Sequence, residues 1–298
     1  MALKDILTDL GDAIREKQGG ATAAEGGTKM TLAEMAEAVR YLSISDGGTV
    51  AMTVFDDMEI NDTSYPSKYT LEGAYFQSGC MFIAAGAFGE CLTLRVVSGT
   101  ASTDANLMVI EANAFRSCIA LESVYLPRAA SACGFCAFAD CSALKMVNLP
   151  LLTETGNLTF SNCCLLETAD IPLLKVMGMG TFSDCRSLRR VKFPACETVG
   201  QMAFTHCTLL KTVDLPACTQ IQGTALVRTF DCCYNLEALI LRNTAAVCTA
   251  ESGVLTYADN AYVYVPSALK SAYETATGWS DYAGRIRAIE DYPDVCGA

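Results

Sequence analysis

Histidine and tryptophan each occur once in this chain of 298 residues, as His206 and Trp279. A histidine metal site, or a Ser–His or Cys–His nucleophile pair, therefore has only one possible histidine member. Basic residues are scarce as well: 21 lysines and arginines against 33 aspartates and glutamates give a net charge of −12. This balance argues against nucleic acid as a partner, because nucleic acid needs a basic face. No segment approaches the ~18 uninterrupted apolar residues of a membrane span, so we expect none.

The first eleven residues do not resemble a secretion signal. Asp5 and Asp9 lie within them, and the apolar run of roughly 7–15 residues that a signal peptide requires is missing. We therefore expect the chain to be made in a reducing compartment, where thiols stay reduced. The sixteen cysteines are accordingly interpreted as free thiols and not as a disulfide framework.

What the chain has in abundance is a repeat. Phe, Cys, Leu, Val and a final Leu-Pro recur in the order Phe-x-x-Cys-x-x-Leu-x-x-Val-x-Leu-Pro, as in residues 115–127 and 204–216. The repeated phenylalanines are Phe88, Phe115, Phe138, Phe160, Phe182, Phe204 and Phe230, and the matching cysteines are Cys91, Cys118, Cys141, Cys163, Cys185, Cys207 and Cys233. Successive phenylalanines lie 22–27 residues apart. A repeat of this length predicts a solenoid, because one repeat cannot bury its own apolar face and must stack on its neighbours.

Each repeat contains two patterns. The segment around the valine, such as Ser123–Leu126, alternates inward and outward residues as a short strand does, and the proline after it ends the strand. The Phe-x-x-Cys-x-x-Leu stretch has apolar residues three apart, which suits one turn of α- or 3₁₀-helix. We therefore predict an α/β repeat fold of the leucine-rich-repeat plan, with one short strand and one short helical turn per coil and with the cysteines in an inward column.

These positions carry a family resemblance. With the preceding apolar-Gly-x-x-Ala stretch, as in Val199–Ala203, the pattern over Ile83–Leu241 resembles the BspA-type leucine-rich repeat of bacteria. Tyr262–Pro266 with Trp279 and Tyr282 looks like the closing segment of such proteins. The segments Ile14–Lys17 and Met30–Ala36 are similar to the start of tail proteins of phages and prophages of Gram-positive bacteria.

The expected organisation has four parts. Residues 1–45 form a two-helix head with a Gly-rich linker, and residues 46–82 supply N-terminal capping strands. Residues 83–248 form the repeats, and residues 249–298 form a capping strand followed by a helix that begins after Pro266.

Candidate catalytic and metal-binding residues are few, and a structural role is favoured for each. Cys133 and Cys136 have the Cys-x-x-Cys spacing, but the repeat puts Cys133 at the inward position of Val199 and no βαβ context surrounds them. His206 occupies a position that other repeats fill with Ser, Asn, Asp or Glu, as a solvated turn residue would. The acidic segment 56–62 lacks the order of a calcium loop. We predict no catalytic, cofactor-binding or metal-binding residues and no enzyme activity.

The candidate binding site lies on the strands. Residues that flank the inward valine point away from the core onto the concave sheet, where leucine-rich repeats commonly bind. The six candidates there are Tyr125, Asn148, Asp170, Arg190, Lys192 and Asp214. Solvated residues with weak cross-strand charge pairs remain the alternative interpretation.

The resemblances lead to a functional hypothesis. We expect a virion or prophage tail-associated protein that binds a protein or cell-surface glycan receptor through the repeats, with residues 1–42 available to other virion proteins. The alternative is a bacterial cell-surface adhesin or an intracellular interaction scaffold of the BspA-like type, located at the cell surface or in the cytoplasm.

Overall fold

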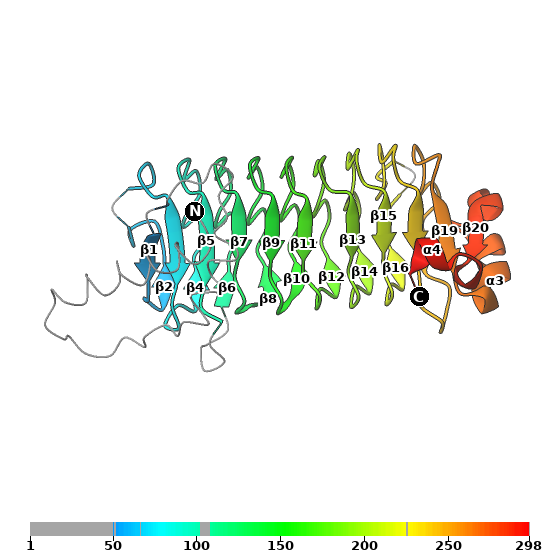
Figure 1. Ribbon diagram of the computed structural model, residues 1–298, viewed down its shortest axis with the longest axis horizontal. Coiled ribbons are helices and arrows are strands. Elements are labelled where there is room, and N and C mark those ends of the chain that lie inside the picture. Colours follow the sequence, from blue (N-terminus) through cyan, green and yellow to red (C-terminus); the bar gives the residue numbers. More distant parts are fainter. Residues whose placement is uncertain (1–49, 51, 66, 102–107, 225, 298) are drawn as a thin grey trace, which may run out of the picture.

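The computed structural model describes residues 50, 52–65, 67–101, 108–224 and 226–297. They form a parallel β-solenoid in which successive coils stack along one axis, with helices only at the C-terminal end (Figure 1). The predicted two-helix head, residues 1–45, lies outside the described residues. Within them, no helix is both long and apolar enough to cross a membrane.

Two layers of parallel strands enclose the core. The first layer, which we call the front face, consists of a six-stranded and a five-stranded sheet. Its strands are β1 (Met52–Phe55), β3 (Gly73–Phe76), β5 (Val96–Gly99), β7 (Ser123–Tyr125), β9 (Met146–Asn148) and β11 (Thr168–Asp170), followed by β13 (Arg190–Lys192), β15 (Thr212–Asp214), β17 (Ala238–Ile240), β19 (Tyr262–Val265) and β20 (Ile286–Ala288). The predicted alternation is confirmed, because the middle residue of these strands faces inward, as Val124 and Val213 do.

The second layer is a nine-stranded sheet, which we call the rear sheet. Its strands are β2 (Glu59–Ile60), β4 (Phe82–Ile83), β6 (Met108–Ile110), β8 (Ala129–Cys133), β10 (Leu152–Thr155), β12 (Val176–Met177), β14 (Thr198–Val199), β16 (Gln220–Ile221) and β18 (Thr249–Ala250). The prediction of one strand and one helical turn per coil is therefore wrong in its second half. Each regular coil has a second strand, which ends at the apolar residue of the apolar-Gly motif, as β14 does at Val199.

The Phe-x-x-Cys-x-x-Leu stretch forms two single turns and no helix. In one coil the N–H of Cys163 donates to the carbonyl of Phe160 at 3.3 Å, and the N–H of Leu166 donates to that of Cys163 at 3.0 Å. Asn162, the residue just before Cys163, has a φ of 61°. A left-handed residue before each cysteine interrupts helical hydrogen bonding, and this explains why apolar residues three apart do not make a helix here.

Left-handed residues recur in two columns, four residues apart in each coil. The first column contains Gly86, Asn113, Cys136, Leu158, Gly180, Met202 and Gly253, and the second contains Glu90, Ser117, Asp140, Asn162, Asp184, His206, Cys232 and Tyr257; only the coil of Cys232 lacks a member of the first column among the described residues. His206 is thus one of a series, and its chemistry is not what selects the conformation.

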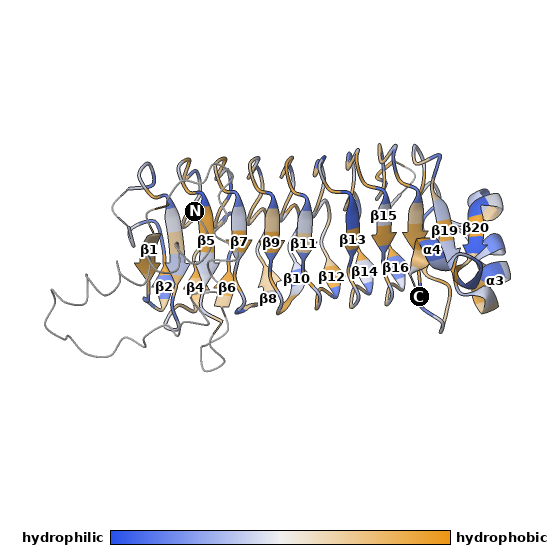
Figure 2. Ribbon diagram, in the orientation of Figure 1, coloured by the Kyte–Doolittle hydropathy of each residue, from blue (hydrophilic) through white to orange (hydrophobic). Residues whose placement is uncertain are grey.

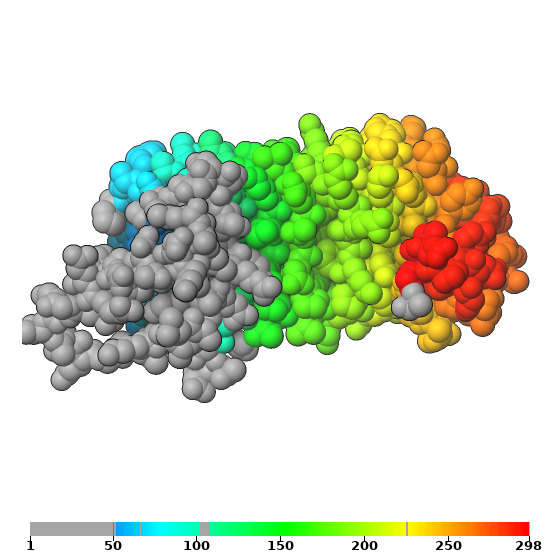
Figure 3. Space-filling model, in the orientation of Figure 1, coloured from blue at the N-terminus to red at the C-terminus, as the bar shows by residue number. Residues whose placement is uncertain are grey.

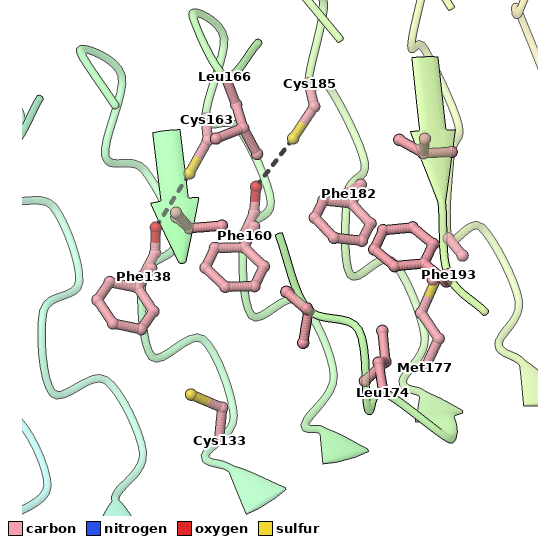
Figure 4. Close-up of a cluster of buried hydrophobic side chains, with 14 of the residues drawn as sticks. Cys133, Phe138, Phe160, Cys163, Leu166, Leu174, Met177, Phe182, Cys185 and Phe193 are labelled. Atoms are coloured by element: carbon pink, nitrogen blue, oxygen red, sulfur yellow. Dashed lines mark hydrogen bonds between the residues drawn. The ribbon is translucent and has the colours of Figure 1, made fainter. Parts of the chain in front are cut away.

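The core holds two ladders that run along the axis (Figure 4). The seven repeated phenylalanines are fully buried and stack in sequence, with neighbouring ring centroids 5.0–5.7 Å apart and ring planes within 13° of parallel. Beside them, each ladder thiol from Cys118 to Cys233 donates to the carbonyl of the phenylalanine one coil earlier, at 3.0–3.3 Å. The cysteine is therefore both a small apolar residue and a donor that joins adjacent coils.

All sixteen cysteines are free thiols, as predicted, and only Cys164 and Cys232 are more than slightly exposed. Burial raises the pKa of the ladder thiols, and it raises that of Cys133 to about 12. Cys218 and Cys248 lie with their sulfurs 3.6 Å apart, well beyond a disulfide bond length.

The ends of the ladders are closed by aromatic side chains. At the first end, the ring of Tyr65 stacks on Phe88 at 5.2 Å, and its hydroxyl donates to the carbonyl of Ala87. At the other end, Trp279 is fully buried and its Nε1 donates to the carbonyl of Cys248. The N–H of Cys248 in turn donates to the hydroxyl of Tyr273 at 2.8 Å.

The C-terminal segment confirms the predicted strand and extends it. Strand β19 has the predicted bounds, and after Pro266 come the 3₁₀ turn η1 (Ser267–Leu269) and α3 (Lys270–Thr275). That strand is not the last, because β20 pairs with it in parallel. The remaining elements are η2 (Ser280–Arg285), η3 (Ile289–Asp291) and α4 (Pro293–Cys296).

Candidate binding face

The outward residues of the front face form two rows, as the repeat predicted. The first row consists of the residues just before the inward residue of each strand, and the second row of those just after it. In the second row Tyr125 pairs with Asn148 and Asn148 with Asp170, and beyond the break between β11 and β13 Lys192 pairs with Asp214. In the first row Arg190 pairs with Thr212. The structure therefore places the six candidate residues on one face, five of them in one row.

Exposure divides these six residues into two groups. Tyr125, Asn148 and Asp214 are buried, with 6, 9 and 7 % of their surface exposed, whereas Asp170, Arg190 and Lys192 are exposed. The expectation that all six point into solvent is therefore wrong for three of them. Tyr125 in particular is not available as an exposed aromatic anchor.

Two adjacent strands in the middle of the solenoid expose all their outward residues, whereas elsewhere on the face only single outward residues such as Val54 and Tyr262 are exposed. Outward residues of β5 and β7 are buried on one side of these two strands, and those of β17 are buried on the other. Only β11 and β13 expose both outward residues, namely Thr168, Asp170, Arg190 and Lys192. We call the outer surface of these two strands the open centre. In Figure 2, β13 is hydrophilic, whereas β17 is largely hydrophobic.

A break in the hydrogen-bonded sheet coincides with the open centre. Strand β11 ends the six-stranded sheet and β13 begins the five-stranded one. At the position just before the strands, the N–H of Lys211 donates to the carbonyl of Arg189 at 2.8 Å, and that of Glu167 donates to Lys145 at 2.8 Å. Among the described residues, no such bond joins Glu167 to Arg189.

The C-terminal segment covers one side of the face (Figures 1 and 3). Cys296 of α4 packs with Ala238, Ile240 and Tyr264 on the outer side of β17 and β19. Arg242 fastens this contact, because its guanidinium donates to the carbonyl of Cys296 and to both carboxylate oxygens of Asp214, the latter at 3.0 and 3.1 Å. Sequence reasoning missed this role, since neither residue belongs to the repeat pattern.

A row of charges borders the face, two residues before each inward residue. Its members, one per coil, are Glu72, Arg95, Glu122, Lys145, Glu167, Arg189, Lys211 and Glu237. Glu122 is mostly buried and forms ion pairs with Arg95 at 2.7 Å and Lys145 at 3.1 Å, and Lys211 pairs with Glu237 at 2.9 Å. We call these residues the charge row. Sequence reasoning overlooked it, although its fixed offset from the valine made it recognisable.

The remaining candidates have structural surroundings. Cys133 is buried and pairs in register with Ile110, as predicted, while Cys136 has φ of 54° in the first left-handed column. His206 is exposed, with its Nδ1 3.6 Å from Asp184. In the acidic segment, Asp56 accepts a hydrogen bond from the N–H of Gly79 at 2.9 Å. Among the described residues, no three His, Cys, Asp or Glu side chains converge as metal ligands would.

Stacked parallel coils of about 22 residues, with an inward ladder and an open outer face, define the leucine-rich-repeat class of solenoid. The BspA type leucine-rich repeat region, with six copies, matches residues 58–176 and 153–276. These matches span well over half of the chain, so the chain belongs to the BspA-type leucine-rich repeat family. This confirms the resemblance drawn from the repeat.

Solved structures with similarity to the chain include three bacterial leucine-rich repeat proteins. A leucine-rich repeat protein of T. pallidum has 24% identity and a TM-score of 0.43, over 59% of this chain and 80% of that one. One from Bacteroides ovatus has 19% identity and a TM-score of 0.40, over 74% and 60%. A leucine-rich cell surface protein of Faecalibacterium prausnitzii has 15% identity and a TM-score of 0.33, over 82% and 84%. No curated protein matches the chain.

Proposed function

We propose that the chain is a non-enzymatic binding protein that recognises its partner through the open centre of the front face. The observation that carries this is the exposure pattern: the outward residues of β5, β7 and β17 are buried, while Asp170, Arg190 and Lys192 remain exposed. Repeat proteins commonly bind their partners through exposed residues that a rigid scaffold holds in place.

We further propose that the protein is a virion or prophage tail-associated component, with a protein or cell-surface glycan as receptor. The support is the similarity of Ile14–Lys17 and Met30–Ala36 to the start of phage tail proteins. In this proposal residues 1–42 attach the chain to other virion proteins. The alternative, a cell-surface adhesin or intracellular scaffold, rests on membership of the BspA-type family. Neighbouring tail, holin and lysin genes would favour the first role, and a surface-anchored context the second.

The binding proposal is tested by reversing two charges of the open centre. Arg190→Glu with Lys192→Glu should abolish binding to whole target cells, because both side chains are exposed and change sign. Stability should change by less than ~0.5 kcal/mol for Arg190→Glu, as at other surface sites, and by more for Lys192→Glu, because that substitution brings a carboxylate toward Asp214. The matched control, Arg116→Glu with Lys175→Glu, makes the same change in net charge outside the front face and should bind as the wild type does.

A deletion separates the roles of the repeats and the head. If the charge-reversed variant binds like the wild type while loss of residues 1–42 abolishes incorporation into particles, the repeats are a spacer and recognition lies elsewhere. If incorporation is unaffected by the deletion, the virion role of residues 1–42 is wrong.

A further inference from the structure

The open centre is positively charged on an otherwise acidic protein. Its coil carries the run Arg189-Arg190-Val191-Lys192, in which Arg190 and Lys192 point outward and Arg189 belongs to the charge row. Lys211 follows in the next coil of that row. Four cations therefore lie within two adjacent coils, although the whole chain has a net charge of −12.

These cations are incompletely paired. Among the described residues, neither Arg189 nor Arg190 has a side-chain hydrogen bond or an ion pair, and both are exposed. Lys192 is 3.8 Å from Asp214, but Arg242 already holds both oxygens of that carboxylate. An arginine fork without a carboxylate is an available site for a planar anion, which it can bind with two parallel hydrogen bonds.

The order of signs in the charge row explains why Arg189 has no partner on one side. From Glu72 to Arg189 the signs alternate from coil to coil, and Arg189 with Lys211 is the one step in the row where like charges adjoin. A backbone hydrogen bond joins Lys211 to Arg189, whereas among the described residues none joins Arg189 to the oppositely charged Glu167. Like charges opposite each other in adjacent strands are destabilising. Lys211 is neutralised by Glu237 at 2.9 Å, so Arg189 is the member of this pair that is left for an external anion.

We propose that Arg189, Arg190, Lys192 and Lys211 form a binding site for an anionic polysaccharide, whose carboxylate or phosphate groups pair with the two arginines. This rests on the proposed function, since it names the ligand class of the same face. The site lies on an open sheet surface, and hollows of about 430 and 410 Å³ lie elsewhere, over β16–β18 and beside Tyr69. An extended polymer fits such a surface.

The composition of the surface favours a polymer over an acidic protein. The outward residues of β11 and β13 are Thr168, Asp170, Arg190 and Lys192, with no aromatic or aliphatic side chain among them. Protein interfaces usually depend on buried aromatic or apolar anchors at their centre. Binding here would be dominated by charge, and so it should weaken strongly as salt is added.

The test compares two variants of the full chain. Arg189→Gln with Arg190→Gln removes the two unpaired forks, and Arg116→Gln with Lys175→Gln is the control with the same loss of charge. Binding is measured to phosphorylated dextran, to polygalacturonate and to uncharged dextran, at low and at high salt. We expect the test variant to lose about tenfold or more in affinity for an anionic polymer, the control to lose little, and dextran not to bind.

Melting temperature supplies the second readout. Arg189→Gln should leave it unchanged, because the Arg189 side chain is exposed and has no hydrogen bond or ion pair among the described residues, whereas a lower value would mean that the arginine is structural and would overturn the inference. Preference for one polymer identifies phosphate or carboxylate as the group bound. Failure of the wild type to bind either polymer overturns the inference, as does capture of an acidic protein in their place. If neither polymer binds but the variant Arg190→Glu with Lys192→Glu still fails to bind target cells, the polysaccharide inference is wrong and the proposed binding function is retained.

Discussion

At the scale of single residues, one phenylalanine and one cysteine per coil join each coil to its neighbour, in addition to the backbone pairing of the strands. Each phenylalanine ring stacks on that of the next coil, as Phe160 does on Phe182. Each ladder thiol donates a hydrogen bond to a backbone carbonyl outside the strands, as Cys185 does to Phe160. Serine could donate the same bond, but it is less apolar in a column with no exposed surface.

Phe182 tests the ladder. Its ring lies between those of Phe160 and Phe204, so Phe182→Ala should lower the free energy of unfolding by about 3–5 kcal/mol. Phe135→Ala is the matched control, because Phe135 is 48% exposed and should cost far less. Urea unfolding of both variants measures the difference, and equal costs would show that the stack contributes nothing particular.

Thiol labelling tests the burial of the cysteines. A thiol-reactive dye should modify Cys164 and Cys232 first in the native protein, and nearly all sixteen after denaturation without reductant, because the rest are buried. Mass spectrometry of the labelled peptides identifies the sites. Disulfides in protein purified without oxygen, or rapid native labelling of Cys163 or Cys185, would contradict this arrangement.

The residues of both ladders could be predicted from the sequence because each repeats at a fixed offset. Burial of Tyr125 and Asp214 could not, because it depends on what lies over the face. For Asp214 that neighbour is Arg242, held in place by a C-terminal segment that follows no repeat. A column of identical positions predicts a face, but only the folded chain shows which part of it is covered.

At the scale of elements, the glycine of the apolar-Gly motif determines how closely the coils approach in the rear layer. A Cβ on Gly178 would lie 2.4 Å from the carbonyl oxygen of Gly156, and one on Gly200 would lie 2.6 Å from backbone atoms of Gly178. Glycine is required at these positions because no side chain fits between the two backbones; neither Gly178 nor Gly200 has a positive φ.

Gly178→Ala should therefore destabilise the protein strongly, because two backbone segments would have to separate. We expect a loss of about 2–4 kcal/mol in chemical unfolding, comparable to the cost of overpacking a core. Gly284→Ala is the control, since a Cβ there meets no atom within 4 Å. If both variants unfold at the same urea concentration, close approach of the coils is not what the glycine provides.

The elements were predicted with uneven success, for a physical reason. The front strands alternate clearly between inward and outward residues and were found, whereas rear strands of two residues, such as Val176–Met177, are too short to show a period. Apolar residues three apart suggested helix, yet two successive turns with a left-handed residue give the same spacing.

Alkaline pH should weaken the whole molecule. Burial raises the pKa of Cys133, Cys196 and Cys233 to about 12 from an ordinary value of 9.0. The folded state thus holds these protons more tightly, so their stabilisation is complete below pH 9 and is lost as pH rises toward 12. Unfolding midpoints measured across this range should fall, and Cys133→Val should show a shallower fall than the wild type.

At the scale of the whole molecule, Arg242 connects the end of the chain to the middle of the front face. Arg242→Ala should release α4 and leave Asp214 buried without its partner, at a cost of about 1–3 kcal/mol. Binding of a hydrophobic dye should increase as Ala238, Ile240 and Tyr264 are uncovered. Arg186→Ala, which breaks an exposed ion pair with Asp184, should change neither quantity appreciably.

The thiol ladder also gives the solenoid a direction. Every thiol from Cys118 onward donates toward the preceding coil, and at the first end Cys91 meets the hydroxyl of Tyr65. The other end, closed by Trp279 and Tyr273, presents different groups. An end-to-end dimer with two-fold symmetry would set the ladders of its two copies in opposite directions, so the series of thiol-to-carbonyl bonds could not continue across its axis. Only a head-to-tail contact would keep the ladder running in one direction through both copies.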